Sequence, residues 1–288
     1  MVAIVGRPNV GKSTLLNALI GEKLSIVTDK PHTTRQRVLG VLNRGADQAV
    51  FIDTPGHARR TKRALHRLMA RQIHQALEDC DVALLLVEAK GLMSQDRVLI
   101  EILEGKLERT FLVLNKIDTV AKSQLLPTLQ KLSDLPFAGF IPVSAKTGEN
   151  LDRLVAQIFE RLPVAPALFP QGMVTDRDLA FRIAEVIREK LMTLVHQEVP
   201  YGLTVEVEHL GMTPEGQRLV HAVIWIERDS QKKIVIGKDG GVLKQAGTEA
   251  RLELRELLGA RVHLELWVKV REHWADSERE LQRLGFEV

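Results

Sequence analysis

The amino-acid sequence predicts two domains: a doubly wound α/β domain with a mainly parallel six-stranded sheet, and a smaller α+β domain after it. In the first half, short apolar runs alternate with amphipathic segments, as in parallel strands joined by helical crossovers. Prolines at positions 163, 166 and 170 then exclude a continuous helix and favour an extended connector. We therefore predict a first domain over residues 1–162, a linker over 163–175 and a second domain over 176–288.

The first domain follows the strand–helix alternation in order. Its helices are expected between the strands and on both faces of the sheet, which places any ligand at the carboxyl ends of the strands. The apolar runs predict strands at Met1–Val5, Val38–Asn43, Ala49–Asp53, Val82–Val87, Thr110–Leu114 and Phe140–Val143. The amphipathic runs predict helices at Lys12–Ile20, Lys62–Leu77, Gln95–Leu103, Ser123–Leu132 and Leu151–Arg161.

The second domain has a different order of elements. A long amphipathic helix comes first, two strands follow, and a basic turn precedes a helix, a strand and a last helix. The helices are expected at Arg177–Val195, Val242–Leu258 and Asp276–Leu284, the strands at Leu203–Glu208, Leu219–Glu227 and Val262–Val270, and the turn at Gln231–Gly241. The tryptophans at 225, 267 and 274 are expected in the core of this domain or at its edge.

Composition excludes several classes of protein. Hydrophobic residues make up 45% and charged residues 27% of the chain, which excludes disordered and low-complexity classes. A single cysteine, Cys80, cannot build a disulfide framework or a cysteine-rich metal site. No apolar stretch is long enough to cross a bilayer and no secretory leader is visible, so we expect a cytoplasmic protein; association with the surface of the inner membrane stays open. Residues 1–170 carry a net charge of +6 and residues 171–288 of −3, so overall charge does not argue for nucleic acid.

A phosphate-binding loop follows the first predicted strand. Residues 6–13 read GRPNVGKS, a G-x-x-x-x-G-K-[ST] pattern between a strand and a helix. Glycines let backbone N–H groups converge on phosphate oxygens, and the helix that follows adds its positive N-terminal end. Lys12 is expected to reach the terminal phosphates and Ser13 to bind Mg²⁺. The residues predicted to surround the phosphates are Asn9, Val10, Gly11, Lys12, Ser13 and Thr14.

A second motif, Asp53-Thr54-Pro55-Gly56, ends the third strand about 40 residues after Lys12. On its own such a sequence is most often a turn. Behind a phosphate-binding loop, Asp53 is expected at the same edge of the sheet as a magnesium ligand, through water. Gly56 is expected to offer its N–H to the γ-phosphate.

The residues after the fifth and sixth strands indicate a guanine site. Asp118, in Asn115-Lys116-Ile117-Asp118, can accept hydrogen bonds from the N1–H and the 2-amino group of guanine, a donor pair that adenine lacks. Asn115 is expected to bond the base N7, Lys116 to lie along the ring, and Ser144-Ala145-Lys146 to offer a backbone N–H to O6. Alone, Asp118 is as readily a helix N-cap. With the base motif in place, an ATP-dependent kinase or ATPase is disfavoured.

These motifs, in this order, resemble the Ras-like GTPase superfamily over residues 1–161. The resemblance implies GTP or GDP and Mg²⁺ as cofactors, with Ser13, Thr34 and Asp53 at the metal. The first switch would be residues 29–37, where the superfamily supplies a threonine to magnesium; Thr34 is our choice, and Thr33 stays an alternative. Catalysis is then assigned to Lys12, Thr34 and Gly56. No glutamine is placed to orient the attacking water, so slow intrinsic hydrolysis is expected.

A basic glycine loop in the second half resembles the Gly-x-x-Gly loop of a K-homology (KH) domain, which clamps the backbone of about four nucleotides. Such a sequence is usually only a turn. Here it lies between helical segments after an α-β-β run and before a helix and a strand, which gives the α-β-β-α-α-β order of the bacterial (type II) KH fold. The predicted RNA contacts are Lys232, Lys233, Ile236, Gly237, Lys238, Gly240 and Lys244.

A Ras-like domain followed by this module resembles the Era family along the whole chain. The resemblance implies a monomeric GTPase that binds the 3′ end region of small-subunit (16S) ribosomal RNA and assists assembly of the 30S subunit. The alternative is an RNA-binding scaffold whose GTP site is structural and nearly inactive. One departure concerns the second switch: His57 follows Gly56 directly, and the segment to Lys62 is one residue longer than usual. His57 is expected to be solvated, and the alternative is that its imidazole positions the attacking water. The basic face of this segment is also expected to be solvated, and the alternative is that it contacts RNA phosphate. It carries Arg59, Arg60, Lys62, Arg63, Arg67 and Arg71.

Overall fold

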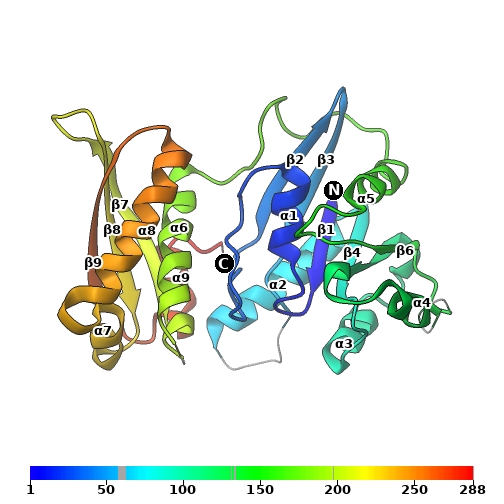
Figure 1. The fold of residues 1–288 in the computed structure, drawn as a ribbon, viewed down its shortest axis with the longest axis horizontal. Helices are drawn as coiled ribbons and strands as arrows, with labels where there is room; N and C mark the ends of the chain where they lie inside the picture. Colours follow the sequence, from blue (N-terminus) through cyan, green and yellow to red (C-terminus); the bar gives the residue numbers. More distant parts are fainter. Residues whose placement is uncertain (58–62, 131, 133, 197, 288) are drawn as a thin grey trace. The chain divides into compact units, whose positions relative to one another are not determined.

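The computed structural model describes residues 1–57, 63–130, 132, 134–196 and 198–287, and it divides into two compact units. The N-terminal unit comprises residues 1–25, 34–61 and 66–176. The C-terminal unit comprises residues 177–288 together with two short pieces of the first half, 26–33 and 62–65. Figure 1 shows both units along the chain. None of the helices in the described part of the chain has the length and apolarity to span a bilayer.

The N-terminal unit is built on a six-stranded sheet in the order β2-β3-β1-β4-β5-β6. β2 and β3 are antiparallel, and every other neighbouring pair is parallel. The central strands are buried on both faces, which explains why they read as continuous apolar runs. The strands are β1 Val2–Gly6, β2 Val38–Arg44, β3 Asp47–Asp53, β4 Val82–Glu88, β5 Thr110–Asn115 and β6 Gly139–Pro142.

Helices cover this sheet and complete the doubly wound fold that the sequence predicts. Ala3 and Val5 of β1 pack in one cluster with Ile73 of α2 and Leu99 of α3. α1 contacts β1, β2 and β3. Since the loops after β1, β3, β5 and β6 all leave the carboxyl ends of their strands, the predicted motifs come together at one edge. The helices are α1 Lys12–Ile20, α2 Ala64–Asp79, α3 Ser94–Ile102, α4 Lys122–Gln130 and α5 Leu151–Phe159.

The predicted linker lies against the N-terminal unit. The Gln48 side chain donates to the carbonyl of Phe169 at 3.0 Å and accepts the N–H groups of Leu168 and Phe169 at 3.0 Å. Further on, the Val41 N–H donates to the carbonyl of Val174 at 2.9 Å. The chain between the two units is therefore held by hydrogen bonds to β2 and β3.

The C-terminal unit is a three-stranded sheet with helices. β7 Leu203–Met212 and β8 Arg218–Ile226 are antiparallel, and β9 Val262–Val270 runs parallel to β8. Alternate residues of β9, including Leu264 and Leu266, face the apolar cluster beneath the helices. The helices are α6 Leu179–Leu194, α7 Asp229–Ile236, α8 Gly241–Leu258 and α9 Glu278–Arg283. The α-β-β-α-α-β order is confirmed.

Two local expectations for this unit are wrong. The predicted basic turn over residues 231–241 is helical as far as Ile236, because the Gln231 side chain caps α7 by accepting the N–H groups of Glu227 and Arg228 at 2.9 and 3.2 Å. The turn is confined to residues 237–240. Among the tryptophans, Trp274 is fully buried, but Trp267 is 41% exposed on the sheet face opposite Leu264 and Leu266.

Candidate functional site

The loop between β1 and α1 has the backbone of a phosphate cradle. Gly11 adopts φ +98°, and a Cβ there would lie 2.4 Å from Nδ2 of Asn115, so only glycine fits. Lys12 is buried and its ammonium donates to the carbonyls of Gly6 and Arg7, both at 3.1 Å. Burial lowers the pKa of Lys12 to about 8, although the nearby Asp53 opposes that shift. A buried ammonium at the start of a helix is suited to an anionic ligand.

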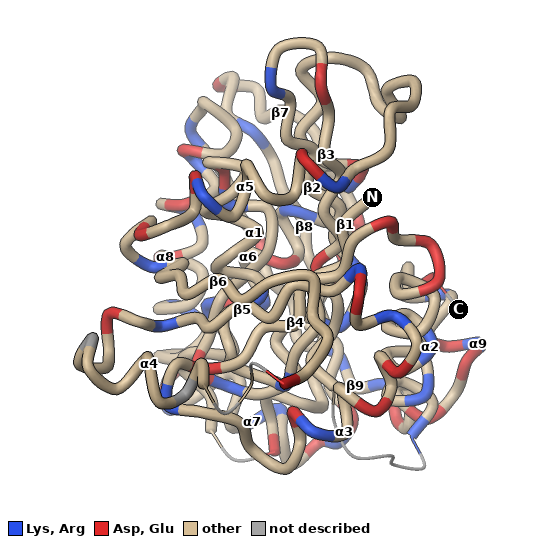
Figure 2. Tube along the Cα trace, turned by 90° about the vertical axis from the view of Figure 1, so that its right-hand side faces the viewer, with Lys and Arg blue, Asp and Glu red and all other residues tan. Residues whose placement is uncertain are grey.

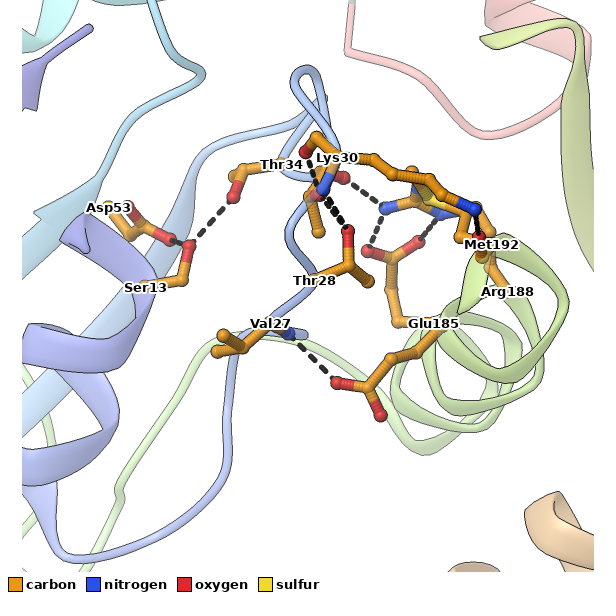
Figure 3. Close-up of polar contacts among 11 residues, drawn as sticks. Ser13, Val27, Thr28, Lys30, Thr34, Asp53, Glu185, Arg188 and Met192 are labelled. Atoms are coloured by element: carbon orange, nitrogen blue, oxygen red, sulfur yellow. Dashed lines mark hydrogen bonds and ion pairs between the residues drawn. The ribbon is translucent and has the colours of Figure 1, made fainter. Parts of the chain in front are cut away.

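Three oxygen-bearing side chains meet at the start of α1. The Ser13 hydroxyl donates to Oδ2 of Asp53 at 2.7 Å and lies 2.8 Å from the Thr34 hydroxyl (Figure 3). Oδ1 of Asp53 is buried and has no hydrogen-bond partner among the described residues. Burial raises the pKa of Asp53, against the opposing effects of Lys12 and Ser13. Carboxylate and hydroxyl oxygens are the donors that Mg²⁺ takes, so this corner fits that ion.

The structure separates the two candidate threonines of the first switch. The Thr33 hydroxyl is engaged within its own loop, where it lies 2.6 Å from the Thr28 hydroxyl and donates to the Lys30 carbonyl at 2.7 Å. The Thr34 hydroxyl is the one that reaches Ser13. The geometry therefore favours Thr34 over Thr33 as a metal ligand.

The residues predicted to read a guanine lie together at the ends of β5 and β6. Oδ1 of Asn115 accepts the N–H of Ala145 at 2.9 Å, while its amide donates to the Val10 carbonyl at 2.8 Å. Asn115 thus ties the phosphate loop to the loop after β6. Oδ1 of Asp118 accepts the Ser144 hydroxyl at 2.6 Å, which fixes one carboxylate oxygen. Lys146 is exposed at the same loop.

A charged cluster beside the phosphate loop was not predicted. Arg7 is nearly buried and forms ion pairs with Glu88 at 3.0 Å and with the fully buried Asp96 at 3.5 Å. Lys116 donates to Glu88 and to the Asn9 carbonyl, both at 2.6 Å. The Lys116 ammonium is thus fixed to the loop. Arg7 occupies a variable position of the motif, and its acidic partners are more than 80 residues away in the chain, so no local pattern indicates them.

The second switch begins with a close backbone approach. A Cβ on Gly56 would lie 2.9 Å from Cα of Pro8, so glycine is needed for the Asp53–Gly56 turn to reach the phosphate loop. The next N–H, of His57, donates to the Gly6 carbonyl at 3.2 Å. The expectation of a solvated His57 is wrong: this side chain is half-buried, and burial, with a smaller effect of His74, lowers its pKa.

The basic face of the second switch is only partly described. Arg59, Arg60 and Lys62 lie outside the described residues. Arg67 and Arg71 are exposed, as expected. Arg63 is instead drawn into ion pairs within the C-terminal unit, with Glu227 at 3.0 Å and Asp276 at 3.4 Å.

In the C-terminal unit, the glycine loop joins α7 to α8. Gly237 has φ +77°, and a Cβ there would lie 2.6 Å from Cγ2 of Val242. Gly240 has φ +75° and is the N-cap residue of α8. No side chain caps this helix, so none bonds the first N–H groups of α8 in the way an N-cap side chain does. Lys233, Lys238 and Lys244 are exposed around the loop, and Lys232 and Ile236 are half-buried. Basic and acidic residues are interspersed along the chain (Figure 2), so within the C-terminal unit we expect attraction for phosphate to be local to this loop.

Comparisons with known proteins agree with this arrangement. Residues 1–116 match the model of a family described as 50S ribosome-binding GTPase, and residues 198–275 match the KH domain. GTPase Era from Yersinia pestis (strain Pestoides F) and from Yersinia pseudotuberculosis serotype O:1b (strain IP 31758) are each 43% identical over 287 residues, which is 99% of this chain and 95% of theirs. The chain belongs to the Era family of GTPases.

Solved structures of Era share the fold of the whole chain. One is a crystal structure of Era in complex with MgGDPNP and nucleotides 1506–1542 of 16S ribosomal RNA, and another is of an Aquifex aeolicus Era variant bound to GDP·AlF4⁻. Each has a TM-score of 0.95, is 38% identical, and covers 100% of this chain and 98% of its own. Membership of the Era family therefore extends over both units, and the enzymatic activity of the chain is that of a GTPase.

Proposed function

We propose that this protein is a GTP-hydrolysing switch that binds the 3′ region of small-subunit ribosomal RNA through its C-terminal unit and assists assembly of that subunit. The corner formed by Ser13, Thr34 and Asp53 carries the nucleotide half of the proposal. The RNA half is supported by the glycine loop and by the Era structure that holds nucleotides 1506–1542 of 16S ribosomal RNA.

The phosphate loop is assigned to binding and to charge stabilisation. On nucleotide binding, the Lys12 ammonium would exchange the carbonyls of Gly6 and Arg7 for phosphate oxygens, whose negative charge favours the protonated lysine. The N–H groups of residues 9–14 and of Gly56 would stabilise the charge that develops as water attacks the γ-phosphate in line. Because these donors are already in place before the reaction, they cost little reorganisation.

Magnesium would be held by Ser13 and Thr34, with Asp53 acting through water. When bound, it neutralises charge on the β- and γ-phosphates. The unpartnered Oδ1 of Asp53 supplies the acceptor that a metal-bound water requires. Ser13 and Thr34 already lie within hydrogen-bond distance of each other, so the protein needs little rearrangement to present both hydroxyls.

Guanine selectivity is assigned to Asp118 and its neighbours. Ser144 donates to Oδ1 of Asp118 and orients the carboxylate, which keeps acceptor positions for the donor pair of the base. A neutral site would accept ATP as well, but a carboxylate left unpaired by adenine imposes a large penalty. The backbone N–H groups of Ser144–Lys146 would meet O6, and Asn115 holds this loop and the phosphate loop together.

The RNA site is assigned to Gly237–Gly240 with the start of α8. Two glycines with positive φ bring the backbone to the surface, and an uncapped helix N-terminus presents N–H groups to a phosphate. Lys238 and Lys244 add positive charge that is exposed to solvent. Half-buried Ile236 is placed to contact a sugar or base beside the loop.

One variant tests the RNA assignment separately from the nucleotide site. Lys238→Asp places an anion where a phosphate must approach and keeps both glycines of the loop. Affinity for an RNA with the 3′-terminal sequence of 16S ribosomal RNA should fall, and the slope of log affinity against log salt should decrease by about 1. GTP affinity and RNA-independent hydrolysis should stay at the wild-type level. Unchanged RNA affinity in the folded variant would reject the loop as an RNA site.

Single-turnover phosphate release, with and without small ribosomal subunits, tests the switch itself. A slow rate that rises on adding subunits is the expected result. A rate that stays negligible in both conditions would favour the alternative, a scaffold with a structural GTP site.

Two finer properties complete the proposal. The protein is proposed to be a monomer, which light scattering of the purified chain tests directly. Association with a membrane surface would be peripheral, and co-sedimentation with vesicles of bacterial inner-membrane lipids would detect it.

A further inference from the structure

The first half of the first switch is folded as part of the C-terminal unit. Residues 26–33, the first-switch segment, cluster with residues 177–288, whereas residue 34 already belongs to the N-terminal unit. One of the points where the chain passes from one unit to the other is therefore the peptide bond between Thr33 and Thr34. This is the bond that leads directly to the proposed magnesium ligand.

Two contacts from α6 hold the backbone of the first-switch segment, one near each end. Oε1 of Glu189 accepts the N–H of Val27 at 2.8 Å. The guanidinium of Arg188 donates to the carbonyl of Thr33 (Figure 3). Because both contacts are made to backbone groups, they restrain the path of the segment whatever its side chains are.

Arg188 is itself held rigidly. Its side chain is only 2% exposed, and it is paired with both carboxylate oxygens of Glu185 at 2.6 Å. A third contact, 3.1 Å, joins the guanidinium to the sulfur of Met192. A buried guanidinium is tolerated only when its donors are paired, so Arg188 is fixed in one orientation, with a donor aimed at Thr33.

Lys30 supplies a third anchor at the end of α6. Its ammonium donates to the carbonyls of Met192 and Val195, which lie in the last turn and at the C-cap of the helix. The last turn of α6 has no basic residue of its own. The switch thus provides the positive charge that stabilises the negative end of the helix.

We propose that Arg188 is a positioning residue for GTP: by fixing the Thr33 carbonyl, it places the Thr34 hydroxyl beside Ser13, where the two hydroxyls would hold magnesium. This inference rests on the proposed function, because it assigns a regulation to that same nucleotide site. It goes beyond that function in naming α6 as the element through which the C-terminal unit controls the first switch.

Reciprocity follows from thermodynamic linkage. If the hold of α6 on Thr33 favours the position of Thr34 that binds Mg·GTP, then Mg·GTP must favour the same hold by the same factor. The RNA-binding unit and the nucleotide then each shift the other's equilibrium through the peptide bond between Thr33 and Thr34. GDP, which lacks the γ-phosphate, should be largely insensitive to Arg188.

The test compares Arg188→Met with wild type in three measurements at saturating Mg²⁺. Affinity for a non-hydrolysable GTP analogue should fall about tenfold, the effect of losing one charge-assisted hydrogen bond, whereas affinity for GDP should change less than about twofold. In Arg188→Met, the RNA affinities of the GTP-analogue and GDP states should also become more nearly equal than in wild type. Arg188→Lys, which can still donate to Thr33, should recover part of both effects.

Two further variants separate positioning from stability. Lys30→Met removes the hydrogen bonds from the first-switch segment to the end of α6 and leaves the buried pair of Arg188 and Glu185 intact. It should therefore lower the affinity for the GTP analogue, but by less than Arg188→Met does. Arg251→Met, at an exposed position of α8, removes the same charge and should change none of the measurements. All comparisons use variants whose tryptophan fluorescence shows a folded C-terminal unit.

The possible failures are distinguishable. If wild type itself has the same RNA affinity in both nucleotide states, the proposed switch function is wrong. If wild type shows a difference and Arg188→Met keeps it in full, the positioning role of Arg188 is wrong. Equal weakening of GTP analogue and GDP by Arg188→Met would also overturn that role, because it would indicate a general structural effect.

Discussion

The glycines of the RNA loop differ sharply in what a methyl group would meet, which allows a graded prediction. An added Cβ at Gly237 would lie 2.6, 2.8 and 2.9 Å from Cγ2, N and Cβ of Val242. At Gly240 and at Gly241, nothing lies within 4 Å of the added atom. Gly237 and Gly240 have positive φ, whereas Gly241 has the helical values of φ −59° and ψ −44°.

These geometries set the expected changes in the free energy of unfolding. Gly237→Ala combines backbone strain of about 1–3 kcal/mol with overpacking of about 1–3 kcal/mol, so a loss of about 2–6 kcal/mol is expected. Gly240→Ala has only the strain of a left-handed residue, about 1–2 kcal/mol. Gly241→Ala should stabilise by about 0.4–1 kcal/mol, because alanine restricts the unfolded chain and fits the helix.

Tryptophan fluorescence is a suitable assay because residues 225, 267 and 274, the three tryptophans of the sequence, all belong to the C-terminal unit. Urea unfolding followed at this signal reports that unit even if the N-terminal unit unfolds separately. The urea concentration at the midpoint should be lowest for Gly237→Ala, higher for Gly240→Ala and highest for Gly241→Ala. Only the midpoint of Gly241→Ala should lie above that of wild type. A Gly237→Ala midpoint equal to or above that of Gly240→Ala would refute the close contact with Val242.

Three further predictions concern the N-terminal unit. The Lys12 pKa is lowered to about 8, and a bound phosphate keeps the lysine charged. Above pH 8, nucleotide binding should therefore take up a proton, and GDP affinity should fall about tenfold per pH unit. Calorimetry in buffers of different ionisation enthalpy measures the proton uptake. Asp118→Asn should weaken GTP but improve xanthosine triphosphate binding in a competition titration, and equal loss of both would remove Asp118 from the base site. Arg7→Met should lower the free energy of unfolding by about 3–5 kcal/mol, because Glu88 and Asp96 lose a buried partner. Unfolding followed by circular dichroism measures this change. An unchanged midpoint would show that these ion pairs do not stabilise the fold.

The fold can be predicted from the sequence because its local signals agree with one another. Apolar runs of four to six residues coincide with the strands of the sheet, and each phosphate or base motif follows directly on a strand end. In a parallel sheet these ends share one edge, so residue patterns alone assign four motifs, spread over about 140 residues, to one site. Helix α7 escapes such patterns because its cap is Gln231, a side chain within the helix that binds backwards to Glu227 and Arg228.

What could not be predicted depends on contacts with no local signature. Adjacent Thr33 and Thr34 have the same side chain, and only the fold shows that one bonds within its loop and the other reaches Ser13. Arg188 contacts a backbone carbonyl 155 residues away, and a backbone acceptor places no constraint on the sequence at that position. Residue patterns therefore locate a switch, but not the element that holds it.

The two proposed phosphate sites share one structural device. α6 and α9 begin with a side-chain cap, in which Asp178 and Ser277 accept an N–H of the first turn. α1 and α8 begin instead after Gly11 and Gly240, both with positive φ and without a side-chain cap. A cap would satisfy the free N–H groups from within the chain and occupy the place of a ligand oxygen. Because a glycine has no side chain to accept these N–H groups, both helices lack the stabilisation of a cap and can bind a phosphate at the N-terminus. We assign a nucleotide phosphate to α1 and an RNA phosphate to α8.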